Sequence, residues 1–90
     1  MKTRDIYTAA VKAYGKDHQL VVCMEEMAEL TKELSKVIRG RGNTNHISEE
    51  IADVEIMLEQ LRVIFNNRSE VDCIKAEKLT RLADRLEVSR

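Results

Sequence analysis

Apolar residues recur at helical spacing through most of the chain, and turn residues interrupt the pattern at three places. These are Gly15, the segment Gly40-Arg41-Gly42-Asn43-Thr44-Asn45, and Asn66-Asn67. The intervals predict helices over about 3–14, 17–39, 46–66 and 69–88, with Asp17 as a cap of the second. Ser69 followed by Asp72 resembles a capping box for the fourth. No segment predicts a strand, so the expected fold is all-α, a four-helix bundle.

Each of the two central helices has an apolar stripe that we expect to form the core. On the second helix the stripe is Leu20, Cys23, Met27, Leu30, Leu34 and Ile38, and on the third it is Ile47, Ile51, Val54, Leu58, Leu61 and Phe65. The third helix also carries Ala52, Ile56 and Val63 on the opposite side. A helix that is apolar on two sides is covered twice, so another subunit is expected to supply the second layer. A fully intramolecular bundle is the alternative.

Two pairs of acidic residues give the clearest chemical signal. Glu26 and Glu29 are spaced i, i+3, as are Glu50 and Asp53, so each pair shares one helix face. Glu50 falls within the apolar arc of the third helix, where an unpartnered charge would cost several kcal/mol. If the helices face each other, four carboxylates converge and need protons or cations, and oxygen-only ligands suit Mg²⁺ or Mn²⁺. In the alternative the acids are solvated, as we expect for Glu49, Glu55 and Glu59.

The composition limits the other classes of function. Ninety residues make a single domain, 1–90, whose own core is thin. A net charge of -1 provides no basic field for duplex nucleic acid or a membrane surface. No apolar run is long enough to span a bilayer and no signal peptide is recognisable, so a cytoplasmic location is the default expectation. Cys23 and Cys73 are expected to be reduced thiols in the core, without zinc or a disulfide.

Basic residues lie where they could hold phosphate oxygens beside a cation. Lys78, Arg81 and Arg85 share one face of the fourth helix, and Lys32 follows Glu29 by about one turn. Arg39 and Arg41 are further candidates. The alternative is that the three long side chains of the fourth helix cover its apolar stripe and keep their charges in water.

The pattern Glu-Glu-x-x-Glu at 25–29, followed by Glu-x-x-Asp at 50–53 in a short all-helical chain, resembles the MazG-like superfamily of all-alpha nucleoside triphosphate pyrophosphohydrolases. The resemblance covers roughly residues 20–61. It implies that Glu26, Glu29, Glu50 and Asp53 bind Mg²⁺, and that Glu25 either supports these ligands from behind or orients water. It also implies cleavage between the α and β phosphates of an NTP or dNTP, in subunits that pair their helices as a homodimer or homotetramer.

Two other classes of function fit the same residues. The chain could be a non-catalytic dimeric helical module that binds a partner through its two-sided third helix. It could also be a relative that binds nucleotide without turnover. The base and sugar of the nucleotide stay open, because Tyr7, Tyr14 and Phe65 are the only aromatic residues and none is recognisable as a base-stacking group.

Overall fold

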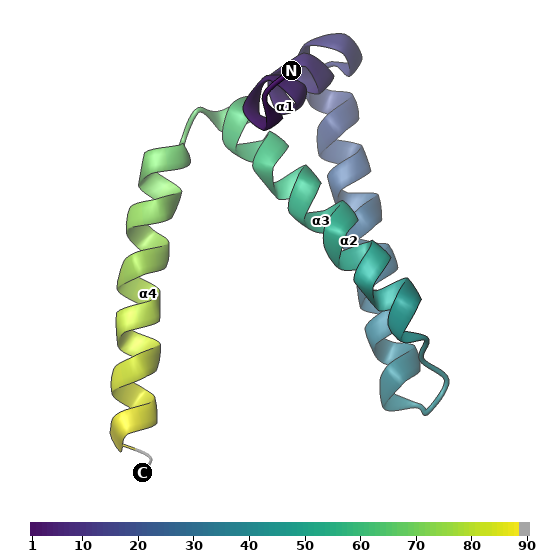
Figure 1. Cartoon of the computed structure of the whole chain (residues 1–90), viewed down its shortest axis with the longest axis vertical. Coiled ribbons are helices and arrows are strands. Elements are labelled where there is room, and N and C mark those ends of the chain that lie inside the picture. Colours follow the sequence, from purple (N-terminus) through teal and green to yellow (C-terminus); the bar gives the residue numbers. More distant parts are fainter. Residues whose placement is uncertain (89–90) are drawn as a thin grey trace.

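The computed structural model describes residues 1–88 and consists there of four helices without a strand. They are α1 (Thr3–Tyr14), α2 (Lys16–Ile38), α3 (Thr44–Phe65) and α4 (Arg68–Val88). The prediction of an all-α fold is therefore confirmed. Helices α2 and α3 run antiparallel as a hairpin, α1 lies across the end of the hairpin, and α4 extends away by itself (Figure 1).

Local signals explain the helix ends. Gly15 ends α1 with a φ of 92°, a conformation that only glycine adopts without strain. Asn43 caps α3, because its Oδ1 atom accepts hydrogen bonds from the backbone N–H groups of Asn45 at 2.9 Å and His46 at 3.3 Å. This cap starts α3 two residues before the predicted position. Helix α4 likewise starts at Arg68, so Ser69 lies inside it and the predicted capping box is wrong.

The core is small and lies between α1, α2 and α3. Its buried apolar residues are Val11, Cys23, Val54 and Met57. Polar residues lie beside them: Gln19 of α2 donates through Nε2 to Oε1 of Gln60 on α3 at 2.7 Å, and both side chains are buried. An amide pair that satisfies itself in this way joins the two helices without leaving that donor and acceptor unpaired.

The predicted apolar stripes form only part of this core, through Cys23 and Val54. On α2 the buried residues are Gln19, Cys23 and Glu33, and on α3 they are Val54, Met57 and Gln60. Several stripe residues are exposed instead: Met27, Leu34, Ile38, Ile51, Leu58 and Phe65. Both helices are thus turned so that a partly polar side faces the neighbouring helix. The reason is that one chain has too few helices to cover every apolar side of α2 and α3.

Helix α4 contributes nothing to the core. None of its residues, Arg68 to Val88, is buried, and it packs against α3 alone. Cys73 lies exposed on α4, so its predicted place in the core is wrong, whereas Cys23 is buried as expected. Both cysteines are free thiols, and burial raises the pKa of Cys23.

Candidate metal centre

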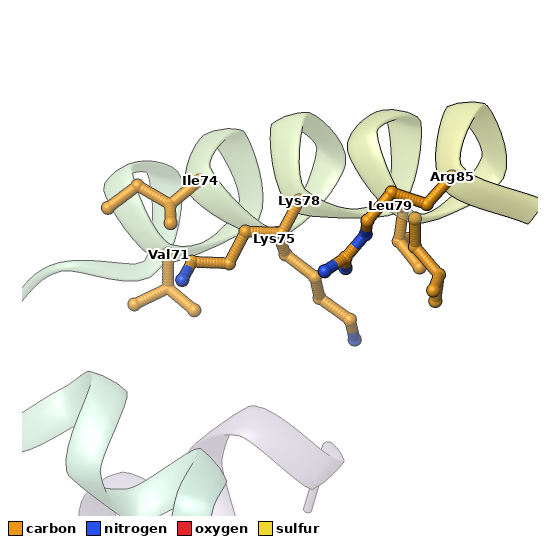
Figure 2. Close-up of a pocket in the computed structure, with 7 residues that line it drawn as sticks. Val71, Ile74, Lys75, Lys78, Leu79 and Arg85 are labelled. Atoms are coloured by element: carbon orange, nitrogen blue, oxygen red, sulfur yellow. The ribbon is translucent and has the colours of Figure 1, made fainter. Parts of the chain in front are cut away.

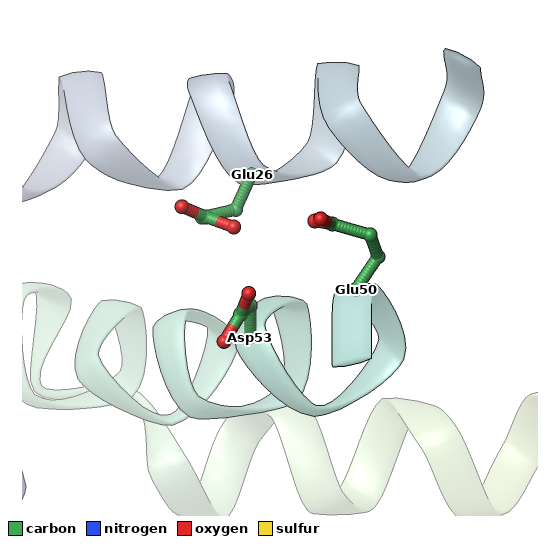
Figure 3. A group of neighbouring side chains, drawn as sticks. All are labelled: Glu26, Glu50 and Asp53. Carbon is green, nitrogen blue, oxygen red and sulfur yellow. The ribbon is translucent and has the colours of Figure 1, made fainter. Parts of the chain in front are cut away.

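Three carboxylates from two helices meet between α2 and α3. Glu26 comes from α2, while Glu50 and Asp53 come from α3, one helical turn apart. Each supplies an oxygen atom, and these atoms all lie within 4.8 Å of one another. Figure 3 shows the three side chains turned toward one another across the space between the helices. The i, i+3 spacing puts Glu50 and Asp53 on one face, and the antiparallel course of the hairpin brings Glu26 opposite them.

The three carboxylates repel one another, and Glu26 shows the effect. The pKa of Glu26 is raised by desolvation, then by the negative charges of Asp53 and Glu50. One oxygen of Glu50, Oε2, is buried and has no hydrogen-bond partner among the described residues. A buried acceptor without a partner costs free energy, and a cation or a shared proton would remove that cost.

The donor set fits a hard divalent cation. All three side chains offer carboxylate oxygens, which suit Mg²⁺ and Mn²⁺ better than soft metals. Asp53 is exposed while Glu26 and Glu50 are partly buried, so the cluster is open to solvent on the side of Asp53. An open side matters for Mg²⁺, because this ion keeps several waters and commonly binds substrate phosphates beside one or two carboxylates.

The two other predicted acids lie next to the cluster. Glu29 is exposed on α2, one turn after Glu26, and it does not belong to the group of three. Glu25 is exposed as well. The structure therefore brings together three of the four expected metal ligands, with Glu29 and Glu25 as exposed carboxylates on the same helix as Glu26.

The predicted phosphate-binding residues lie on two separate helices. Lys32 is exposed on α2, the helix that carries Glu26. Lys78 and Arg81 line a groove on α4 together with Asp84 and Arg85. Because α4 contacts α3 alone and diverges from the hairpin, Lys78 and Arg81 do not meet the carboxylates of their own chain (Figure 1).

Sequence reasoning missed the burial of Glu33. Its side chain is 10 % exposed, and its Oε1 atom accepts from Nζ of Lys36 at 3.1 Å. Its Oε2 atom is buried without a hydrogen-bond partner and lies 3.9 Å from Nδ1 of His46. Glu33 follows Glu26 by seven residues, about two helical turns, so both lie on the same side of α2. This spacing could have predicted that Glu33 is buried against α3.

Glu59 also differs from its expected role as a solvated acid. It is partly buried and accepts from Nη1 of Arg68 at 2.7 Å, with Nε of Arg62 at 3.7 Å. By contrast Glu49 and Glu55 are exposed, as predicted. Glu49 is therefore the better control for substitutions in the carboxylate cluster.

Comparisons with known proteins add no assignment. No protein-family model matches the chain, and no curated protein or solved structure matches it significantly. Within residues 1–88, no helix is both long enough and apolar enough to cross a membrane. The arrangement of the carboxylates is thus the main structural guide to function.

Proposed function

We propose that the protein is a Mg²⁺-dependent nucleoside triphosphate pyrophosphohydrolase that converts an NTP or dNTP to the monophosphate and pyrophosphate. The convergence of Glu26, Glu50 and Asp53 between α2 and α3 is the observation that carries the proposal. The resemblance of the two acidic motifs to the MazG-like superfamily supports it from the sequence. Mn²⁺ is the expected substitute for Mg²⁺.

The roles of the residues follow from their positions. Glu26, Glu50 and Asp53 hold the cation, and Glu29 joins them through a change of rotamer or through a water. When bound, the cation offsets phosphate charge and lowers the pKa of a coordinated water. Glu25 is exposed beside Glu26 and orients the attacking water in this proposal. Lys32, on the same helix as Glu26, binds phosphate oxygens, whereas Lys78 and Arg81 lie on α4, which contacts α3 alone.

Self-association is part of the proposal. The apolar residues that the chain leaves exposed on α2 and α3, among them Met27, Leu34, Ile51 and Leu58, are of the kind that pair helices between subunits. A homodimer is the minimum assembly, and a homotetramer satisfies the same requirement.

The same exposed residues favour a second candidate function. In that case the chain is a non-catalytic dimeric module, or a nucleotide-binding relative without turnover, and its assembly rather than its chemistry is its role. The two candidates differ in one measurable property, which is turnover of a nucleotide.

The test is an assay of the purified protein with a panel of NTPs and dNTPs, with Mg²⁺, Mn²⁺ or a chelator. We expect pyrophosphate and monophosphate only with the cation. Glu50→Gln and Asp53→Asn should each lower kcat/KM by roughly 10²–10³, since the cluster serves charge developing in the transition state. Glu49→Gln changes an exposed acid adjacent to Glu50 and should leave the rate unchanged.

Product analysis separates the alternatives. Orthophosphate with a nucleoside diphosphate would assign attack at the terminal phosphate and contradict the proposed reaction. Absence of turnover for every nucleotide, together with calorimetric binding of one of them, would favour the nucleotide-binding relative. Absence of both would favour the helical module.

A further inference from the structure

Helices α3 and α4 diverge from the turn that joins them (Figure 1), and exposed side chains of each helix line a groove. We call them the α3 wall, which comprises Ala52, Glu55, Ile56, Leu58 and Glu59, and the α4 wall, which comprises Val71, Lys75, Lys78, Leu79 and Leu82. In Figure 2 the labelled side chains Val71, Lys75 and Lys78 leave α4 on the side that faces the rest of the chain. Lys75 lines the grooves of both walls, so the two surfaces border one space.

Each wall mixes apolar side chains with charges of one predominant sign. Ile56 and Leu58 are 45 % and 43 % exposed on the α3 wall, and Leu79 and Leu82 are also exposed on the α4 wall. The α3 wall carries Glu55 and Glu59, with Arg4 and Arg62 in the same groove, and Glu59 is already paired with Arg68. Glu55 is therefore the acid that the basic α4 wall, with Lys75 and Lys78, would meet. Apolar side chains gathered on one exposed face indicate an interaction surface, and the charges beside them indicate what each wall pairs with.

The turn between α3 and α4 holds the two walls apart. Nη1 of Arg62 donates to Oδ1 of Asp72 at 2.6 Å, and Nη1 of Arg68 donates to Oε2 of Glu59 at 2.7 Å. Asn66 takes the left-handed conformation, with φ 49° and ψ 47°, at the end of α3. These contacts, which we call the elbow, tie the first turns of α4 to the last turns of α3. A closing movement of α4 onto its own α3 would have to break or rearrange them.

We infer that α4 of a second copy of this chain packs its α4 wall on the α3 wall. In a two-fold dimer the exchange is reciprocal, because the same surfaces meet twice. Lys75 and Lys78 of one copy then face Glu55 of the other, and the leucines of α4 cover Ile56 and Leu58. The inference rests on the self-association proposed above and is independent of the catalytic activity.

Charge reversal on each wall tests the exchange. One variant is Lys75→Glu/Lys78→Glu and the other is Glu55→Lys, and all three positions are exposed and thus compatible with folding. In either homodimer like charges meet at both contacts, so we expect the dissociation constant to rise about tenfold or more. In an equimolar mixture the heterodimer has opposite charges at both contacts. Its dissociation constant should return to within about threefold of the wild-type value.

Sedimentation velocity over a dilution series measures these constants, and circular dichroism checks that each variant stays helical. Glu77→Lys, on the side of α4 away from the wall, is the control and should leave the constant unchanged.

Three outcomes would overturn the exchange. A monomeric wild type at micromolar concentration would remove the second copy. Dimers that ignore both reversals would place the interface elsewhere and leave self-association intact. Weakened dimers that mixing does not restore would show that α4 acts within its own chain. The hydrolysis assay on the wild type and on Glu55→Lys reports on the catalytic proposal separately.

Discussion

The hairpin with α1 and the single helix α4 use similar residues in opposite ways. Among the described residues the hairpin buries two glutamines and one glutamate, Gln19, Gln60 and Glu33, while it leaves many of its large apolar residues exposed. Helix α4 buries nothing and exposes its leucines beside lysines. Helix formation and burial are therefore separate properties in this chain. The hairpin includes polar contacts in its buried part, and α4 presents apolar side chains that its own chain leaves uncovered.

The largest effect that this comparison predicts is on folding stability. Met57 is 5 % exposed in the hairpin core, and Leu79 is 56 % exposed on α4. Met57→Ala should lower the free energy of unfolding by about 2–5 kcal/mol, through lost burial and the cavity left behind. Leu79→Ala should change it by less than about 0.5 kcal/mol, as surface substitutions do. Urea denaturation at a concentration where the protein is monomeric measures both.

Equal losses for the two variants would contradict the division of the molecule into a packed hairpin and an uncovered helix. If the Leu79→Ala loss appears only at concentrations where the protein associates, the comparison is sharpened, because the cover of α4 would then depend on a second copy.

A smaller effect is expected from the cation. Binding of Mg²⁺ to the folded state alone, at ten times its dissociation constant, adds roughly 1.4 kcal/mol of stability. For a domain of this size that corresponds to a rise of about 6–11 °C in Tm. Asp53→Asn should remove most of the rise, and Glu49→Gln should keep it. Differential scanning calorimetry with Mg²⁺, Mn²⁺ and a metal-free control measures the shifts.

An unchanged wild-type Tm, with no heat of Mg²⁺ or Mn²⁺ binding even when nucleotide is present, would rule out the carboxylate cluster as a cation site. A rise that Glu50→Gln abolishes and Glu29→Gln does not would limit the ligands to the three acids that meet in the structure.

The smallest effect concerns the elbow and has a definite pH dependence. Arg62 holds the pKa of Asp72 below its ordinary value of 3.8, first through a hydrogen bond and then through its charge. An acid with a lowered pKa in the folded state stabilises that state above its unfolded pKa and loses the contribution as the pH falls through the folded pKa. The elbow contact should therefore be complete above about pH 5 and weaken below about pH 4.

Hydrogen exchange at the Val71 amide reports on the elbow, because this amide donates to the carbonyl of Asn67 at 2.9 Å in the first turn of α4. Wild type should be more protected than Asp72→Asn at pH 6, and the difference should shrink toward pH 3. Because Asp72 is exposed, the difference is expected to be small. A difference that is constant from pH 6 to pH 3 would mean that the ion pair does not hold the elbow.

The sequence predicted the local structure well for definite physical reasons. Glycine and asparagine turn signals located the four helices, and the ends of α2 and α3 and the start of α4 differ from the predicted positions by one or two residues. The predicted cap at Asp17 is wrong, because α2 starts at Lys16 and Asp17 lies in its first turn. Helical spacing also selected Glu50 and Asp53 as a pair sharing one face, and the structure brings Glu26 to them. Periodicity fixes which residues share a face, and that part of the site depends on nothing else.

What the sequence could not predict is which face is covered. An apolar stripe such as Ile51, Leu58 and Phe65 is the same pattern whether its cover comes from the same chain or from another. For this reason the prediction placed the apolar stripes at the helix contact and did not place Glu33 and Gln60 there, although both are buried. The prediction that Cys73 lies in the core was wrong for the same reason. Its helix, α4, has the apolar spacing of a core helix but lies outside the core.

The hydrogen bond between Gln19 and Gln60 has a consequence for the alignment of the two long helices along their axes. A slide of α3 by one helical turn would displace its side chains by about 5.4 Å relative to α2. That displacement exceeds the 4.8 Å within which the oxygens of Glu26, Glu50 and Asp53 gather. Apolar contacts are non-directional and oppose such a slide less, whereas the hydrogen bond between the two amides, 2.7 Å long, would be broken by it. The buried glutamines thus act as an axial stop that keeps the three carboxylates opposite one another.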